Sequence, residues 1–151
     1  MKRAAAALVI VLLAGCDPAP PGPPPVGTKA LPPARLRVQQ ILIAFRGAKD
    51  ALPRVSRTRE EAEVLAKRIL ERARQGEDFK KLIQENTDDD GKKEIGMVSA
   101  GTRPRGDERR REGFDKGLAD VAFGLAVGEA GMAPYDPRDA PTGFHIIKRT
   151  Q

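Results

Sequence analysis

The residue with the clearest capacity for chemistry is His145, the only histidine of the chain. It belongs to residues 142–149, in which Phe144 and Ile146 alternate with His145 and Ile147, as in a β-strand with two apolar faces. An imidazole can donate or accept a proton near neutral pH, so His145 could take part in catalysis or bind a ligand. A single histidine on an apolar face is more often a hydrogen-bonded core residue, and this segment alone leaves both interpretations open.

A second polar residue in an apolar segment is Gln40. The segment has two alternating rows, Leu36, Val38, Gln40, Leu42 and Ala44 on one side and Arg37, Gln39, Ile41, Ile43 and Phe45 on the other. Gln40 is the one polar residue of its row, and the second half of the segment is apolar on both faces. This pattern predicts a central strand that is covered on both sides.

Three adjacent carboxylates, Asp88, Asp89 and Asp90, precede a short predicted strand at residues 95–98. Adjacent acids suggest a calcium ion, but the alternating ligand spacing and the following glutamate of an EF-hand loop are missing. No phosphate-binding loop is found elsewhere in the chain. The sequence therefore predicts neither a metal nor a cofactor.

Three helices are predicted around these strands. Thr58 and Glu61 form a capping box before apolar residues that recur at helical spacing to residue 73, and Gly76 is the expected C-terminal stop. Asp78 caps a shorter helix that ends near Asn86. A third helix begins at residue 115 or 116 and reaches residue 125.

Residues 99–113 carry five arginines, from Arg103 to Arg111, and few apolar side chains. This composition predicts a solvated, mobile flap, with contact to an anionic lipid or polymer as the alternative. The predicted order is strand, helices, strand, helix and two strands, without a βαβ period. It indicates one α+β domain of about 117 residues, 35–151, with a small antiparallel sheet.

The N-terminus predicts export. Lys2 and Arg3 precede an apolar run over residues 4–13, which is too short to span a bilayer and is typical of a secretory signal. Residues 13–16, Leu-Ala-Gly-Cys, resemble the lipobox of bacterial lipoproteins. The resemblance implies a signal peptide over residues 1–15 and a lipid on Cys16, the only cysteine. An ordinary signal peptide followed by a free thiol is the alternative.

Residues 17–33 contain eight of the 13 prolines and predict an extended spacer, so residues 16–34 would tether the domain to a membrane facing the periplasm. A proline-rich ligand for another domain is the alternative. Asp17 resembles the inner-membrane retention signal of enteric bacteria, a rule that varies between bacteria. Loss of Lys2 and Arg3 leaves 25 basic residues against 21 acids, about +4 instead of +6, and no nucleic-acid partner is predicted.

Residues 35–151 resemble a parvulin-type peptidyl-prolyl cis/trans isomerase domain. The motifs that carry the resemblance are the strand at residues 40–43, the helix start at 58–62, the turn at 76–79, the acidic loop at 87–89, the helix at 118–125, Gly128-Glu129 and the strand at 143–148. Their order and spacing extend over some 115 residues. The resemblance implies a four-stranded antiparallel sheet surrounded by about four helices, with the site on one sheet face.

The resemblance also implies the site residues. Asp89 falls where the family has a cysteine or an aspartate, His145 at the second site histidine, and Thr142 at a nearby hydroxyl. The positions that line the proline pocket correspond to Ile95, Phe114, Leu118 and Phe123. Taken singly, each of these residues is better explained by structure alone, Asp89 as a helix or turn cap, Thr142 as a turn residue and Gln40 as a satisfied strand residue. Taken together on the family pattern, they favour a site.

Two departures from the family pattern concern activity. Gln40 stands at the first site histidine, and residues 92–96 replace the usual Gly-Gly-Asp-Leu-Gly run. An amide can still donate and accept hydrogen bonds but cannot act as an imidazole. Three functions follow as hypotheses: an envelope-anchored prolyl isomerase acting on Xaa-Pro segments of secreted proteins, a peptide-binding chaperone of weak or absent activity, and a structural lipoprotein that binds anionic polymer or lipid through Arg103–Arg111.

Overall fold

The computed structural model describes residues 32–91 and 93–151. The predicted signal peptide, Cys16, Asp17 and all but the last residues of the tether lie outside the described residues. Within the described ranges, no helix has both the length and the apolar character needed to cross a membrane.

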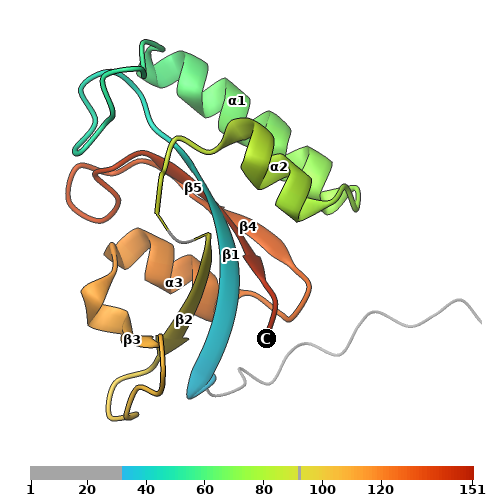
Figure 1. Ribbon diagram of the computed structural model, residues 1–151, viewed down its shortest axis with the longest axis vertical. Coiled ribbons are helices and arrows are strands. Elements are labelled where there is room, and N and C mark those ends of the chain that lie inside the picture. Colours follow the sequence, from blue (N-terminus) through green and yellow to red (C-terminus); the bar gives the residue numbers. More distant parts are fainter. Residues whose placement is uncertain (1–31, 92) are drawn as a thin grey trace, which may run out of the picture. The chain divides into compact units, whose positions relative to one another are not determined.

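Five strands form one sheet, in the order β3-β2-β1-β5-β4 (Figure 1). The strands are β1 (Arg35–Ile43), β2 (Glu94–Val98), β3 (Arg109–Arg110), β4 (Ala130–Ala133) and β5 (Phe144–Arg149). The helices are α1 (Arg59–Arg74), α2 (Phe79–Asn86) and α3 (Lys116–Gly124), with a 3-10 turn, η1, at Arg111–Gly113. The α+β class and the predicted order of the long elements are confirmed.

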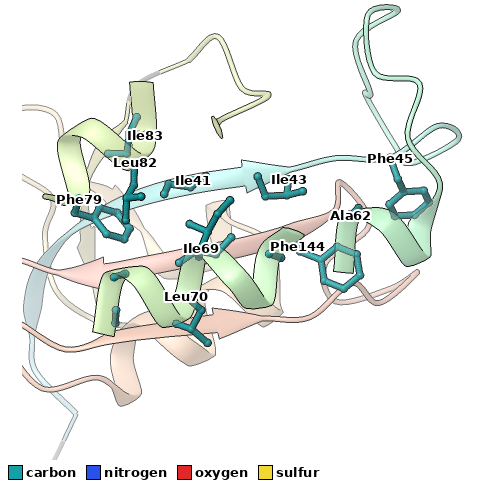
Figure 2. Close-up of a cluster of buried hydrophobic side chains, with 14 of the residues drawn as sticks. Ile41, Ile43, Phe45, Ala62, Ile69, Leu70, Phe79, Leu82, Ile83 and Phe144 are labelled. Atoms are coloured by element: carbon teal, nitrogen blue, oxygen red, sulfur yellow. The ribbon is translucent and has the colours of Figure 1, made fainter. Parts of the chain in front are cut away.

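The central strand β1 is covered on both sides, as its two apolar rows predict. On one face, α1 and α2 pack over Ile41, Ile43 and the β5 residues Phe144 and Ile146 (Figure 2). Ile41, Ile43 and Ile146 have no exposed surface, and α1 adds Ile69, which is also fully buried. Burial of such side chains contributes about 1.5–3 kcal/mol each, so this dry layer is a main source of stability.

The other face of the sheet packs against α3. Leu36 and Val38 of β1, Met97 of β2 and Ile147 of β5 form a second core cluster there. Leu118, Ala122 and Phe123 of α3 complete this cluster. Beyond them, Gln40 on β1 and His145 on β5 continue the same face and are its buried polar residues. The α3 face is therefore apolar at one end and polar at the other.

The helix ends agree with the sequence signals. Thr58 accepts the backbone N–H of Glu61, and Glu61 accepts that of Thr58, which completes the predicted capping box. Gly76 follows the last turn of α1 at φ +89°, a left-handed conformation that glycine adopts without strain. Asp78 caps α2, which ends at Asn86 as expected.

The predicted counts of strands and helices are corrected by the structure. The sheet has a fifth strand, because β3 pairs in parallel with the outer edge of β2 at Met97↔Arg109 and Val98↔Arg110. Three α-helices and η1 are found among the described residues, instead of about four helices. The segment 99–113, predicted as a mobile flap, folds against the sheet edge, where Glu108 pairs with Arg35.

Candidate active site

A cleft of about 800 Å³ opens at the polar end of the α3 face. The regular pairing of β2 with β1 stops at Gln39↔Glu94. Beyond it, the acidic loop bonds to the edge of β1, with the Lys93 carbonyl accepting the Gln40 N–H and the Asp88 N–H donating to the Leu42 carbonyl. The cleft is lined by most of the predicted site residues, Gln40, Asp89, Ile95, Phe114, Leu118, Thr142 and His145. The fold therefore brings seven of the eight predicted residues of the domain to one place.

The first polar group of the cleft is centred on Thr142. Its hydroxyl lies 3.0 Å from Asp115 Oδ2 and 2.9 Å from His145 Nε2. The His145 and Asp115 side chains are 3.7 Å apart at these atoms, and the His145 side chain is only 6% exposed. The nearby imidazole, followed by the Thr142 hydroxyl, holds the pKa of Asp115 below its usual 3.8, although burial opposes this effect. Asp115 is therefore ionised at neutral pH.

Local structure explains how these three side chains meet. Gly143, between Thr142 and β5, has φ +144°, and a Cβ on it would lie 2.5 Å from the Ile43 carbonyl oxygen. Only glycine fits this close approach, and the turn places Thr142 beside His145. Asp115 occupies the N-cap position of α3, but its side chain makes no capping hydrogen bond. Its carboxylate is directed to Thr142 instead.

The second polar group joins Gln40 to Asp89. Gln40 Nε2 donates to Asp89 Oδ2 at 3.4 Å, and the Gly91 backbone N–H donates to Asp89 Oδ1 at 2.7 Å. Lys93 Nζ is 4.0 Å from the same carboxylate. A carboxylate held by these donors acts as a hydrogen-bond acceptor, and its contacts give it no partner that would activate it as a nucleophile.

Three buried polar atoms of this region have no hydrogen-bond partner among the described residues: Gln40 Oε1, His145 Nδ1 and Lys93 Nζ, of which only Lys93 Nζ has an ion-pair partner, Asp89. Buried polar groups in folded proteins are nearly always paired, and each unpaired one costs about 1–3 kcal/mol. Such atoms are concentrated where a protein serves function at the expense of stability. Their presence beside the cleft distinguishes this end of the sheet from the packed core.

Apolar side chains also line the cleft. Ile95, Phe114 and Leu118 pack against the second core cluster and also line the cleft. Phe114 is covered by Arg109, whose guanidinium carbon lies 4.6 Å from the ring centroid. Phe123 is placed elsewhere: it is 7% exposed, lies under Arg111 at 4.9 Å and is not among the lining residues. Five helical positions separate it from Leu118, which turns it about 140° away.

Two arginine–aspartate pairs fasten the loop of residues 46–57 beside the cleft. Arg57 pairs with Asp88, and the same carboxylate accepts the Ala44 backbone N–H at 2.9 Å. Arg54 pairs with Asp90 at 2.9 Å in a far more exposed position. Two of the three adjacent acids therefore hold the loop, while Asp89 turns to Gln40. Among the described residues, no group of three or more potential ligands is arranged to hold a metal ion.

Several residues that line the cleft were not predicted, among them Asp115, Leu42 and Leu52. Leu42 shares the row of Gln40, so alternation along β1 was a signal that could have identified it. Asp115 is recognisable in the sequence only as a helix start, and its partner Thr142 is 27 residues away. Leu52 comes from an irregular loop for which the sequence carries no such signal.

Comparison with known proteins identifies the family. The model of the PPIC-type PPIASE domain matches residues 26–151. No curated protein sequence matches the chain closely enough to count as a relative. Among solved structures, the peptidyl-prolyl isomerase ESS1 from Candida albicans has a TM-score of 0.60 at 24% identity, covering 78% of this chain and 63% of that one.

Two further structures show the same fold. The solution structure of TbPIN1 matches at TM-score 0.57 and 19% identity, covering 78% of this chain and 98% of that one. The crystal structure of the PPIase domain of TbPar42 matches at 0.56 and 22%, covering 77% and 99%. The family match, which extends over most of the chain, supports peptidyl-prolyl cis/trans isomerase activity. The chain belongs to the family of PPIC-type, or parvulin, peptidyl-prolyl isomerase domains.

Proposed function

We propose that this protein is an envelope-anchored peptidyl-prolyl cis/trans isomerase that assists the folding of secreted or membrane proteins. The observation that carries the proposal is the cleft on the α3 face, whose lining combines apolar side chains with polar side chains that hydrogen-bond to one another. The substrate would be an Xaa-Pro segment of an unfolded chain, with the proline ring against Ile95, Phe114 and Leu118.

The chemistry requires no bond to be made or broken. The barrier is rotation about a partly double C–N bond, about 18–20 kcal/mol. A catalyst must bind the twisted amide, in which conjugation is lost, more tightly than the planar one. The apolar side chains of the cleft would hold the ring and remove water, which disfavours the charge-separated planar amide.

The polar residues would provide the local field. Gln40 and Asp89 form one hydrogen-bonded pair and Thr142 and His145 form another, and all four line the same cleft. Hydrogen bonds and fixed dipoles in a site of low water content are worth more than in solution. We assign Asp89 the role of ordering the Gln40 amide, consistent with its contacts to Gln40 and the Gly91 N–H.

Anchoring rests on the first residues of the chain. The apolar run, the lipobox-like residues and Cys16 support export and lipidation, and the proline-rich segment supports a spacer between membrane and domain. Intact mass measurement of the membrane fraction tests this: a lipid on Cys16 adds acyl mass and is lost in Cys16→Ser. An unmodified thiol in a soluble fraction would contradict the anchor.

A peptide-binding chaperone of low activity is the second candidate, and Gln40 is the observation that favours it. Its amide replaces a family histidine, and its Oε1 is buried without a partner among the described residues. The anionic-polymer hypothesis has less support, since Arg109 and Arg111, two of the five arginines on which it relied, are stacked on Phe114 and Phe123.

Exchange NMR on a short Xaa-Pro peptide series separates these functions. We expect acceleration by the full chain in mild detergent, a large loss in His145→Ala and Asp89→Ala, and a gain in Gln40→His. Glu71→Gln, an exposed change on α1, is the control. Binding without acceleration in any variant would favour the chaperone, and neither binding nor acceleration would contradict both.

A further inference from the structure

Asp115 lines the cleft, and the proposed function gives it no role. Its contacts determine where the Thr142 hydroxyl proton and the His145 ring proton lie. An ionised carboxylate can only accept, so the single hydroxyl proton of Thr142 is donated to Asp115 Oδ2, 3.0 Å away. The Thr142 oxygen then has no proton left for His145. The contact of 2.9 Å between Thr142 Oγ1 and His145 Nε2 must therefore be donated by the imidazole.

The protonation state of the other ring nitrogen of His145, Nδ1, follows from this assignment. A neutral imidazole that carries its proton on Nε2 has a lone pair on Nδ1. Nδ1 is buried and has no hydrogen-bond partner among the described residues. A proton on Nδ1 would thus be an unpaired donor in a buried place, which is a further reason for the Nε2–H form. His145 also shares its sheet face with Gln40, whose Oε1 is the second unpaired acceptor.

We infer that Asp115 is a positioning residue, which acts through Thr142 to hold His145 as the neutral Nε2–H tautomer with its Nδ1 lone pair on the buried side of the ring. Asp115 makes this contact in place of the capping bond that its position at the start of α3 would otherwise offer. The inference rests on the proposed function for its effect on isomerisation, but not for the tautomer itself.

This arrangement defines what His145 can do in the cleft. Its Nε2–H is committed to Thr142, and its Nδ1 can accept but not donate. His145 is therefore an acceptor and a fixed dipole, not a proton donor to the rotating carbonyl. The unpaired Nδ1 also gives a reason for the gain in activity expected of Gln40→His. The imidazole N–H introduced at position 40 would have a buried acceptor, His145 Nδ1, on the same sheet face.

Histidine ¹⁵N NMR tests the tautomer directly, because His145 is the only histidine and the spectrum reports one ring. The full chain, labelled with ¹⁵N-histidine in mild detergent at pH 7, should show a protonated Nε2 and an unprotonated Nδ1. Asp115→Asn should shift the population toward Nδ1–H, because its NH₂ can donate to Thr142 and release the hydroxyl proton to Nε2. In the Asp115 wild-type background, Thr142→Ser keeps the hydroxyl and should keep the wild-type pattern, whereas Thr142→Val removes the hydroxyl and should not.

Asp120→Asn is the matched control, since it removes an exposed carboxylate of the same helix that pairs with Lys116. It should leave both the tautomer and the exchange rate unchanged. In peptide exchange, Asp115→Asn should lose about tenfold to a hundredfold in kcat with little change in KM, as expected for lost orientation. Circular dichroism checks the fold of each variant, and the wild-type spectrum decides the tautomer even if a variant does not fold.

A protonated Nδ1 in the wild type, with or without a proton on Nε2, would overturn the inference. An unchanged tautomer in folded Asp115→Asn would overturn the role of Asp115. If the wild type shows the Nε2–H form but accelerates no peptide, the proposed function fails while the tautomer assignment stands.

Discussion

The two faces of the sheet are built from the same strands, but one is covered by helices and the other is covered only in part. Under α1 and α2, the β1 residues Ile41 and Ile43 and the β5 residues Phe144 and Ile146 form a closed apolar layer. Figure 2 shows Ile69, Leu82 and Phe79 of the helices packed against this layer. Under α3, the apolar layer ends at Val38 and Ile147, and the cleft begins. The closed face provides stability, which allows the open end of the other face to keep unpaired polar atoms.

The largest effect is expected from the closed face. Ile69→Ala should lower the free energy of unfolding by about 2–5 kcal/mol, because the removed methyl groups leave a cavity in a fully buried layer. Urea unfolding measures it. Val64→Ala, on the same helix but 58% exposed, should change stability by less than about 0.5 kcal/mol. Similar losses in the two variants would contradict the placement of Ile69 in the closed apolar layer.

An intermediate effect on stability is expected at the arginine–aspartate pairs that hold the loop of residues 46–57 beside the cleft. Asp88→Ala should cost about 1–3 kcal/mol, since it leaves the Ala44 N–H and Arg57 without their partner in a largely buried position. Thermal unfolding provides the measurement. Asp90→Ala removes the exposed partner of Arg54 and should cost at most about 1 kcal/mol. A larger loss of stability in Asp90→Ala than in Asp88→Ala would contradict the expectation that the buried pair contributes more than the exposed one.

A small effect on stability, with a large one on activity, is expected inside the cleft. Gln40→Leu removes an amide whose Oε1 is unpaired and whose Nε2 bond is long, so the free energy of unfolding should change by less than about 1 kcal/mol or rise. Peptide exchange should nevertheless be lost. Denaturation and exchange NMR on one sample compare the two quantities. A marked destabilisation would mean that Gln40 is a structural residue.

The smallest effect concerns acid stability. The folded-state pKa of Asp115 is lowered, so its ionised form stabilises the fold above the ordinary aspartate pKa of 3.8. This contribution is lost as the pH falls below 3.8 and through the lowered folded-state pKa. Asp115→Asn should therefore remove part of the decline in stability below that pH, as measured by chemical denaturation at several pH values. An identical pH profile in wild type and variant would contradict the assigned contacts.

Local signals in the sequence predicted most of the fold. The alternation in β1, the capping box at Thr58 and the stop at Gly76 each depend on residues close in the chain, and each was confirmed. The strand β3 was not predicted, because its two arginines have no apolar alternation and pair only through contact with β2.

The site was predictable only where a family pattern supplied long-range information. Residues such as Asp89 and Thr142 have no local feature that distinguishes them from turn and cap residues. Asp115 was missed for the same reason. Its role depends on a hydrogen bond with Thr142, which lies 27 residues away in the chain and is brought beside it only by the fold. Phe123 shows the opposite error: it fits the family position, but the helical period directs it away from the cleft.

The most direct test is to map where an Xaa-Pro peptide binds, using amide chemical-shift changes on titration into the labelled protein. Binding at the open end of the α3 face predicts changes in residues 89–91, 93–95, 114–118 and 142–145, with little change along the outer side of α1 around Val64. Changes centred on α1, or spread without focus over both faces of the sheet, would contradict the assignment of the cleft as the peptide site.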